Sequence, residues 1–290
     1  MIRFRNNLIT IFTIIILILG TVGSTELYGQ NPQRLGKVTS AAITEISGIV
    51  PYGYEEGYFW VHNDSGDGPN IYLIDSKASL KVRVEIEGVK ALDIEDIGRF
   101  QLNDKKYLLL ADMGNNLRDR EILSLYIIEE PKVNFNVSSI KVPLVKELKF
   151  RYIDKRRDAE ALFVDPLDLQ VYILSKRDFE STVFSFPIDL KSDQVNVVKP
   201  LQTLPFTFTT AADISSDGKY ILAKNLTHIY FWERKNKESI IETFQSEPKI
   251  IPYQIEPQGE AICFDLKKRF FYTISERPFG LDSYLYRYDF

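Results

Sequence analysis

The chain has 290 residues, of which 44% are hydrophobic and 26% are charged. This ordinary globular composition argues against disorder, and a formal net charge of −4 offers no basic surface for nucleic acid or anionic lipid. The single cysteine, Cys263, excludes an internal disulfide, so stability must come from packing or from a bound ion.

The N-terminal segment has the pattern of an export signal. Arg3 and Arg5 precede an apolar run over residues 8–19, and small or polar residues follow. The run is shorter than the roughly 20 residues of a membrane-spanning helix, which favours a cleaved secretory signal over an uncleaved anchor. We therefore expect residues 1–30 to be removed. Residues 31–290 are then a single exported domain, periplasmic or extracellular, with no membrane span and no nucleic-acid partner.

The rest of the chain is a tandem repeat of short β-rich strings. Each repeat starts with an apolar string that contains one polar position, and two aromatic and aliphatic strands follow. The polar positions align Ser47, Glu95, Glu160, Ala212 and Glu260, at separations of 48, 65, 52 and 48 residues. Second strands are expected at 58–61, 107–110, 171–174, 220–222 and 270–273, and third strands at 71–74, 125–128, 183–186, 229–232 and 284–288.

The repeat length suits a four-stranded propeller blade. Fourth strands are expected at 82–86, 140–150, 195–198 and 240–244, and the long second repeat holds an insertion within 130–151. The last repeat ends without room for a fourth strand, so residues 35–44 are expected to supply it and close the ring. The predicted fold is all-β: a β-propeller of about five four-stranded blades, with six as the alternative.

The aligned polar positions predict a central metal site. The first strand of each blade lines the channel of a propeller, so Glu95, Glu160 and Glu260 should face one axis. Carboxylates held this close must take up protons or share a cation, and oxygen ligands in an irregular cavity suit Ca²⁺. The predicted calcium ligands are Ser47, Glu95, Glu160 and Glu260. The alternative is a water-filled channel with solvated glutamates and no ion.

Polar residues that follow the second strands should lie at the same mouth of the channel. The predicted substrate-contacting residues are Asn63, Asp64, Asp112, Lys176, Arg177, Lys224 and Arg277. The first two blades would supply an acidic and amide half, and the last three blades a more basic half. Cations beside a metal suit a small anionic ligand that carries phosphate. Solvated loop charges are the alternative.

No catalytic residue can be assigned from the sequence. The segment 62–68, His-Asn-Asp-Ser-Gly-Asp-Gly, lacks the twelfth-position glutamate of a calcium loop, because that position is Ile74. Ser65 and His62 are too close in sequence to assume a useful geometry, and no Gly-x-Ser-x-Gly elbow occurs. A plain turn is favoured for this segment.

Four motifs carry a resemblance to known proteins. They are Glu-Ile-Ser-Gly at 45–48, His-Asn-Asp-Ser-Gly at 62–66, Asp-Ala-Glu-Ala-Leu at 158–162 and Pro-Gln-Gly-Glu-Ala at 257–261. Together they resemble a family of uncharacterised exported bacterial propellers. More loosely, the register of Ser47, Glu95, Glu160 and Glu260 is similar to that of calcium-activated nucleotidases, or apyrases. Calcium-dependent phytases and regucalcin-like lactonases are similar in their acidic central tunnels.

The nucleotidase resemblance implies a five-bladed ring, a central calcium held by serine and glutamate oxygens, and hydrolysis of nucleoside di- and triphosphates. Ala212 departs from that pattern because it offers no side-chain oxygen. Three functions stay open: a metal-dependent hydrolase of phosphate esters or anhydrides, a non-catalytic binding or scaffold propeller for a small anion or a protein, and a lactonase or other esterase. The fold alone does not choose between them.

Overall fold

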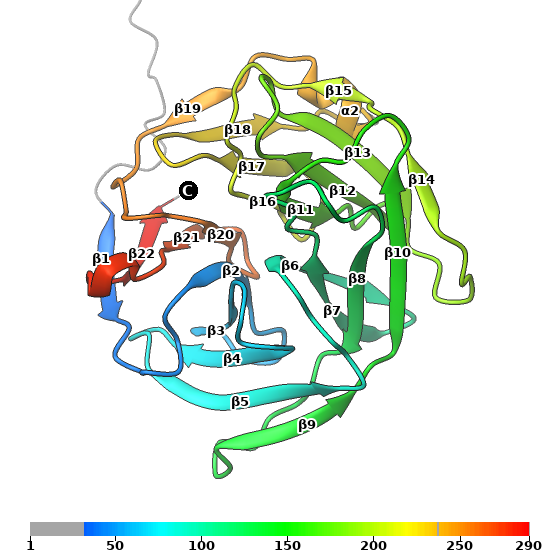
Figure 1. Cartoon of the computed structure of the whole chain (residues 1–290). Helices are drawn as coiled ribbons and strands as arrows, with labels where there is room; N and C mark the ends of the chain where they lie inside the picture. Colours follow the sequence, from blue (N-terminus) through cyan, green and yellow to red (C-terminus); the bar gives the residue numbers. More distant parts are fainter. Residues whose placement is uncertain (1–31, 237, 290) are drawn as a thin grey trace, which may run out of the picture.

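The computed structural model describes residues 32–236 and 238–289, and it confirms a five-bladed β-propeller (Figure 1). Five sheets stand around one axis, and each sheet has four antiparallel strands at its centre. The predicted export signal, residues 1–30, lies outside the described residues. Within the described part of the chain, no helix is both long enough and apolar enough to cross a membrane.

The innermost strand of every blade is the first landmark of a sequence repeat. These strands are β2 (Ile46–Pro51), β6 (Ile94–Leu102), β11 (Ala159–Val164), β16 (Ala211–Ile214) and β20 (Ala261–Phe264). Each inner strand contacts the next around the ring, and β20 contacts β2. We call the end of the channel where these strands begin the upper mouth, and the end where they finish the lower mouth.

The second and third strands also lie where the repeat predicts them. The second strands are β3 (Tyr58–Asn63), β7 (Lys105–Asp112), β12 (Gln170–Ser175), β17 (Tyr220–Lys224) and β21 (Phe270–Ile274). The third strands are β4 (Asn70–Asp75), β8 (Leu123–Glu129), β13 (Thr182–Pro187), β18 (Ile229–Glu233) and β22 (Tyr284–Asp289). Their apolar side chains pack between blades, as with Phe59 of the first blade and Tyr272 of the fifth, whose ring centroids are 4.6 Å apart.

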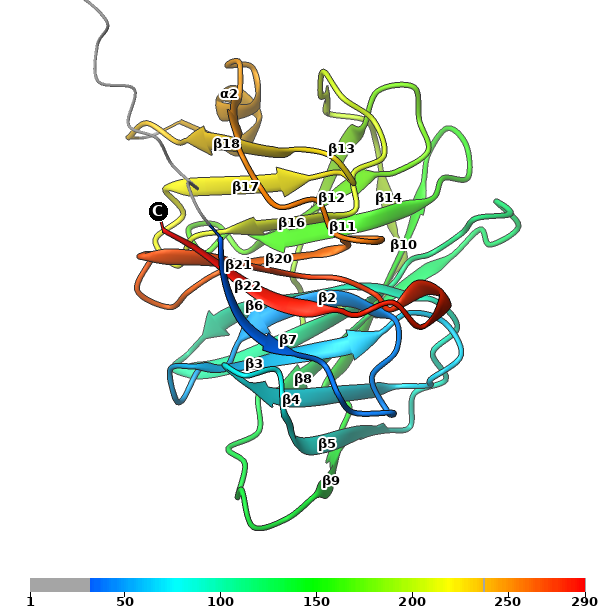
Figure 2. The ribbon, with the colours of Figure 1, turned by 90° about the vertical axis from the view of Figure 1, so that its left-hand side faces the viewer.

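The N-terminal strand closes the ring, as the missing last strand predicts. Strand β1 (Gln33–Lys37) pairs antiparallel with β22, from Gln33 opposite Arg287 to Lys37 opposite Tyr284. The two ends of the described chain therefore share one blade (Figures 1 and 2). This pairing covers the outer edge of the fifth blade and leaves no open break in the ring.

Two of the predicted fourth strands belong elsewhere. The first blade has the expected β5 (Leu80–Glu87), but the predicted strand 140–150 is two strands. Strand β10 (Lys146–Tyr152) completes the second blade, whereas β9 (Ser139–Pro143) crosses to pair parallel with β5. Strand β14 (Asn196–Val198), predicted for the third blade, instead pairs parallel with β10. The insertion in the second repeat thus ties the first two blades together.

The remaining fourth strands are short and were not predicted. They are β15 (Gln202–Thr203) in the third blade and β19 (Lys249–Ile251) in the fourth. The strand predicted at 240–244 is wrong, because this segment is a helix, α2 (Ile240–Phe244). Ser239 and Glu242 form a capping box, each side chain accepting from the backbone N–H of the other, and this local bonding favours the helix. A 3₁₀ turn, η1 (Pro278–Gly280), precedes β22.

Candidate metal site

Three inner strands carry a β-bulge at the position that the sequence repeat aligns. The pairing register with the second strand shifts across Ser47 in β2, across Glu95 in β6 and across Glu160 in β11. A bulge re-aims the side chain of its extra residue and often lies beside a functional site. No shift occurs at Ala212 in β16, and Glu260 precedes β20. The repeated polar position is therefore one structural feature shared by three blades.

Five carboxylates converge at the upper mouth in two groups. Oxygen atoms of Asp64, Asp93 and Glu95 all lie within 4.8 Å of one another, and we call this group the first triad. Oxygen atoms of Glu95, Asp158 and Glu160 meet the same limit, and we call them the second triad. Glu95 belongs to both triads, so it stands at the centre of the cluster.

Glu95 is buried without a compensating partner. The residue is 2% exposed, and no described residue donates a hydrogen bond to its carboxylate or forms an ion pair with it. Burial raises the pKa of Glu95 well above its usual range, and the charges of Asp64 and Asp93 add to this effect. A buried carboxylate in such surroundings is stabilised either by a proton or by a cation.

Asp64 and Asp93 lie together in the same triad, and both side chains are half-buried. Burial, followed by the charges of Asp93 and Glu260, raises the pKa of Asp64 to about 7. Burial also raises the pKa of Asp93. A cation that binds here would compete with protons, because carboxylate ligands bind metals in their ionised form.

Asp93 is held in place by Asp112, which follows it in the hairpin of β6 and β7. The Asp112 carboxylate accepts hydrogen bonds from the backbone N–H groups of Leu92 and Asp93, both at 3.1 Å. It also forms an ion pair with Arg120 at 2.7 Å. Asp112 was predicted to contact substrate, but it is 1% exposed and positions the loop that carries Asp93.

A glycine leaves room for the first triad. A β-carbon on Gly114 would overlap both Glu95 Oε1 and Asp93 Oδ2. Its φ lies outside the left-handed region, so the close approach of the carboxylates, rather than backbone conformation, is what requires glycine here. The chain after β7 is thus shaped around the acidic cluster.

The second triad has internal counter-charges that the first triad lacks. Lys176 Nζ forms an ion pair with Glu160 and lies 3.2 Å from Glu260 Oε1. Arg177 Nε donates to Asp158 at 2.7 Å. In the first triad no comparable ion pair reaches a carboxylate from the described residues. The carboxyl groups of the triads without an ion pair from the described residues are therefore those of Asp64, Asp93 and Glu95.

Two predicted ligands lie beside the triads rather than in them. Ser47 Oγ donates to the backbone carbonyl oxygen of Glu95 at 2.8 Å, which ties the first blade to the second. Burial, followed by the close approach of Glu260, raises the pKa of Glu276 to about 9. Glu260 thus lies between Lys176 and Glu276.

Three residues predicted to contact substrate form hydrogen bonds within the fold. Asn63 Oδ1 accepts from two backbone N–H groups of the loop before β2, at 3.0 and 3.1 Å. Lys224 is fully buried, donates to the carbonyl of Gly259 and lies 3.8 Å from a carboxylate oxygen of Glu256. Arg277 Nη1 donates to a backbone carbonyl at 3.3 Å. Of the predicted set, Asp64, Lys176 and Arg177 reach the acidic cluster.

The sequence repeat identified Glu95 and Glu160 but passed over Asp93 and Asp158 as ligands. A signal was present: Asp-x-Glu occurs at 93–95 and again at 158–160. In both cases the aspartate lies immediately before the inner strand, so both carboxylates of the motif lie at the upper mouth.

Comparisons with known proteins give no match from which a function could be inferred. No protein-family model matches the chain, and no curated protein matches its sequence. The resemblance to exported bacterial propellers and to calcium-activated nucleotidases therefore rests on the short motifs alone.

Proposed function

We propose that the chain is a calcium-binding β-propeller whose ion is held by Asp64, Asp93 and Glu95 at the upper mouth. The observation that carries this proposal is the Glu95 carboxylate, which is buried, central to both triads and without a donor among the described residues. Ca²⁺ takes six to eight oxygen ligands, so three side chains leave positions for water or for ligand oxygens.

The donor set favours calcium over other common ions. All five clustered side chains are carboxylates, which suit hard cations and not the nitrogen and sulfur preferences of zinc. Magnesium demands a near-ideal octahedron, whereas calcium accepts irregular arrangements such as a cluster contributed by several blades. The predicted export signal adds support, because extracellular calcium sites function with dissociation constants of about 10⁻⁴ to 10⁻³ M.

We extend the proposal to metal-dependent hydrolysis of phosphate esters or anhydrides. An ion with open positions binds phosphate oxygens and activates water. Asp64 and Asp93 are half-buried, so an ion between them is reachable from the upper mouth. The competing proposal is a non-catalytic binding propeller. It is favoured by one observation: Lys176 and Arg177 are already paired with carboxylates, which leaves them poorly placed to clamp a phosphate.

Measurements of stability and of activity under the same conditions test both the calcium site and the proposed hydrolysis. We would measure melting temperature with calcium, magnesium or chelator, and hydrolysis of nucleotides, phytate and lactones under the same conditions. A calcium-dependent rise in melting temperature with phosphate release supports the hydrolase. The same rise without turnover supports the binding propeller, and lactone turnover supports an esterase. A melting temperature indifferent to calcium and chelator rejects the metal site.

A further inference from the structure

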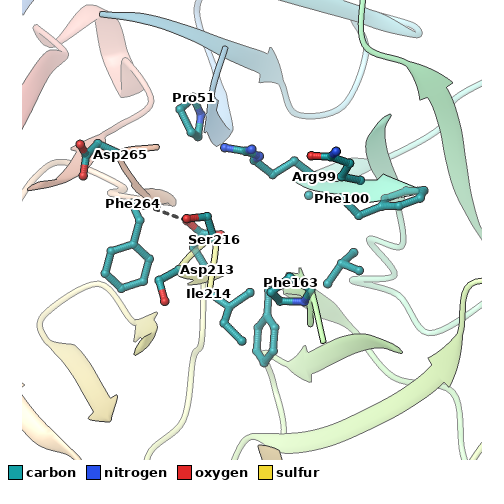
Figure 3. Close-up of a pocket in the computed structure, with 14 residues that line it drawn as sticks. Pro51, Arg99, Phe100, Phe163, Asp213, Ile214, Ser216, Phe264 and Asp265 are labelled. Atoms are coloured by element: carbon teal, nitrogen blue, oxygen red, sulfur yellow. Dashed lines mark hydrogen bonds between the residues drawn. The ribbon is translucent and has the colours of Figure 1, made fainter. Parts of the chain in front are cut away.

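A cavity opens at the lower mouth, at the opposite end of the inner strands from the acidic triads (Figure 3). Its volume is about 120 Å³. Apolar side chains make up much of its wall, among them Pro51, Phe100, Phe163 and Phe264. The cavity therefore combines a small space with a lining that is part apolar and part polar.

Arg99 of β6 directs its side chain into this cavity (Figure 3). The residue is half-buried, and its guanidinium has no hydrogen bond or ion pair with any residue that the structure describes. Other arginines with little exposure are paired: Arg120 with Asp112 at 2.7 Å, and Arg234 with Asp165 at 2.8 Å. Arg99 thus differs from the structural arginines of this fold.

The nearby carboxylates are bound to other groups. Asp213 Oδ2 accepts from the backbone N–H of Phe264 at 2.7 Å (dashed in Figure 3). Asp265 Oδ1 accepts from the backbone N–H groups of Arg269 and Phe270, at 2.6 and 2.9 Å. Each carboxylate stabilises its own turn or blade contact, and neither forms an ion pair with Arg99 within the described structure.

We propose that the lower cavity binds a small oxyanion, a carboxylate or phosphate group, on Arg99. A guanidinium presents a planar fork of donors that matches such groups in a bidentate manner. The apolar wall lowers the local dielectric constant, which strengthens an ion pair relative to one in open water. Gln101 also lines the cavity and has no side-chain hydrogen bond among the described residues, so it supplies a second polar contact.

The cavity volume limits the ligand. About 120 Å³ corresponds to roughly four water molecules at their liquid volume. A phosphate ion or a carboxylate with a few attached atoms fits this space. Because the cavity and the triads lie at opposite ends of the inner strands, this site is separate from the proposed calcium site and can be tested without calcium.

Calorimetric titration with inorganic phosphate and with acetate tests the proposal. The protein is freed of metal on a chelating resin, since soluble chelators are themselves carboxylates, and ionic strength is held constant. We expect one site, weakened at least tenfold by Arg99→Gln. Arg99→Lys should keep phosphate binding better than acetate binding, because lysine retains the charge and loses the fork. The relative affinities of phosphate and acetate in the wild type identify the preferred oxyanion.

Two further variants show whether a change in anion binding comes from the cavity itself. Arg83→Gln removes an exposed arginine that donates to Asn70 Oδ1, and it should leave anion binding unchanged. Ser216→Asp places a carboxylate at the cavity wall while Arg99 stays intact, and it should abolish anion binding. The proposal is overturned if neither anion binds the wild type, if Arg99→Gln binds as tightly, or if Ser216→Asp leaves binding unaffected.

Discussion

The two triads at the upper mouth contain the same kind of residue and differ in their counter-charges. The second triad meets Lys176 on Glu160 and Arg177 on Asp158, so much of its charge is neutralised from within the chain. The first triad shares Glu95 with it, yet no ion pair reaches Asp64 or Asp93 from the described residues. The number of carboxylates therefore does not decide where a cation binds. The cation should bind where no Lys or Arg side chain already pairs with the carboxylates.

Removal of Lys176 should lower the unfolding free energy more than any other change considered, because it takes away the counter-charge that distinguishes the second triad from the first. Lys176→Met leaves Glu160 and Glu260 buried without their ammonium, and breaking a buried ion pair costs about 3–5 kcal/mol of unfolding free energy. Calcium should restore much of this stability by occupying the second triad. Denaturant unfolding with and without calcium measures both effects. A calcium-free variant as stable as the wild type would contradict the assigned role of Lys176.

Glu95→Gln should remove the calcium response. If calcium binds only the folded ring, a hundredfold excess over the dissociation constant adds about 2.7 kcal/mol, or roughly 5 °C in melting temperature. The variant should lose this shift and be no less stable than the wild type without calcium, because a buried amide needs neither a proton nor a cation to become neutral.

Two matched variants sharpen the Glu95 result. Glu129→Gln removes a rim carboxylate that pairs with Lys105, and it should keep the full response. Glu160→Gln should keep most of it, since Glu160 belongs to the neutralised triad. An equal loss in Glu95→Gln and Glu160→Gln would show that the two triads act as one site.

The pH dependence of calcium binding should follow the first triad. Asp64 has a pKa of about 7, so calcium must displace its proton below that pH. Affinity should therefore rise with pH through about 7, and the raised pKa values of Asp93 and Glu95 add to the rise. Calorimetric titrations between pH 5.5 and 8.5 measure this slope. A pH-independent affinity would show that Asp64 is not a ligand.

Without calcium, the unfolding free energy should fall as pH rises, whereas calcium affinity should increase. Asp64 and Glu276 hold protons in the folded state up to about pH 7 and pH 9, whereas the unfolded chain releases them near pH 4. The folded state then binds more protons, so unfolding free energy falls as pH rises from about 4 to 9. Glu276→Gln should flatten the part above pH 7. Denaturant unfolding at several pH values checks the sign, and a rise in stability over this range would contradict the account.

Ser47→Ala should give the smallest effect. Its hydroxyl hydrogen bond to the Glu95 carbonyl contributes about 1 kcal/mol, so the melting temperature should fall by a few degrees. The calcium-induced shift should persist, because the Ser47 hydroxyl is bound to the Glu95 carbonyl. Loss of that shift would make Ser47 a ligand, as the nucleotidase resemblance implies.

Much of the fold could be predicted from the repeat because three strands per blade are long and apolar. The fourth strands could not, since β15 spans Gln202–Thr203 alone and such short polar edges resemble loops. The apolar run Ile240–Phe244 fits either a strand or a helix by pattern, and the capping box of Ser239 and Glu242 decides for the helix.

The site was predictable only in part. Glu95 and Glu160 follow from the aligned register, because the repeat places them at one level of the channel. The pairing of Lys176 with Glu160 and Glu260 joins the third blade to the fifth, and it depends on distances across the channel that no local pattern encodes. The unpaired state of Arg99 depends on the same kind of long-range geometry.

The most direct test of the central claim is an anomalous difference map from a crystal grown with calcium. The account predicts a peak in contact with carboxylate oxygens of Asp64, Asp93 and Glu95, with Lys176 still paired to Glu160. A peak enclosed by Glu95, Asp158 and Glu160 with Lys176 displaced would contradict it, and so would a map with no peak at the upper mouth.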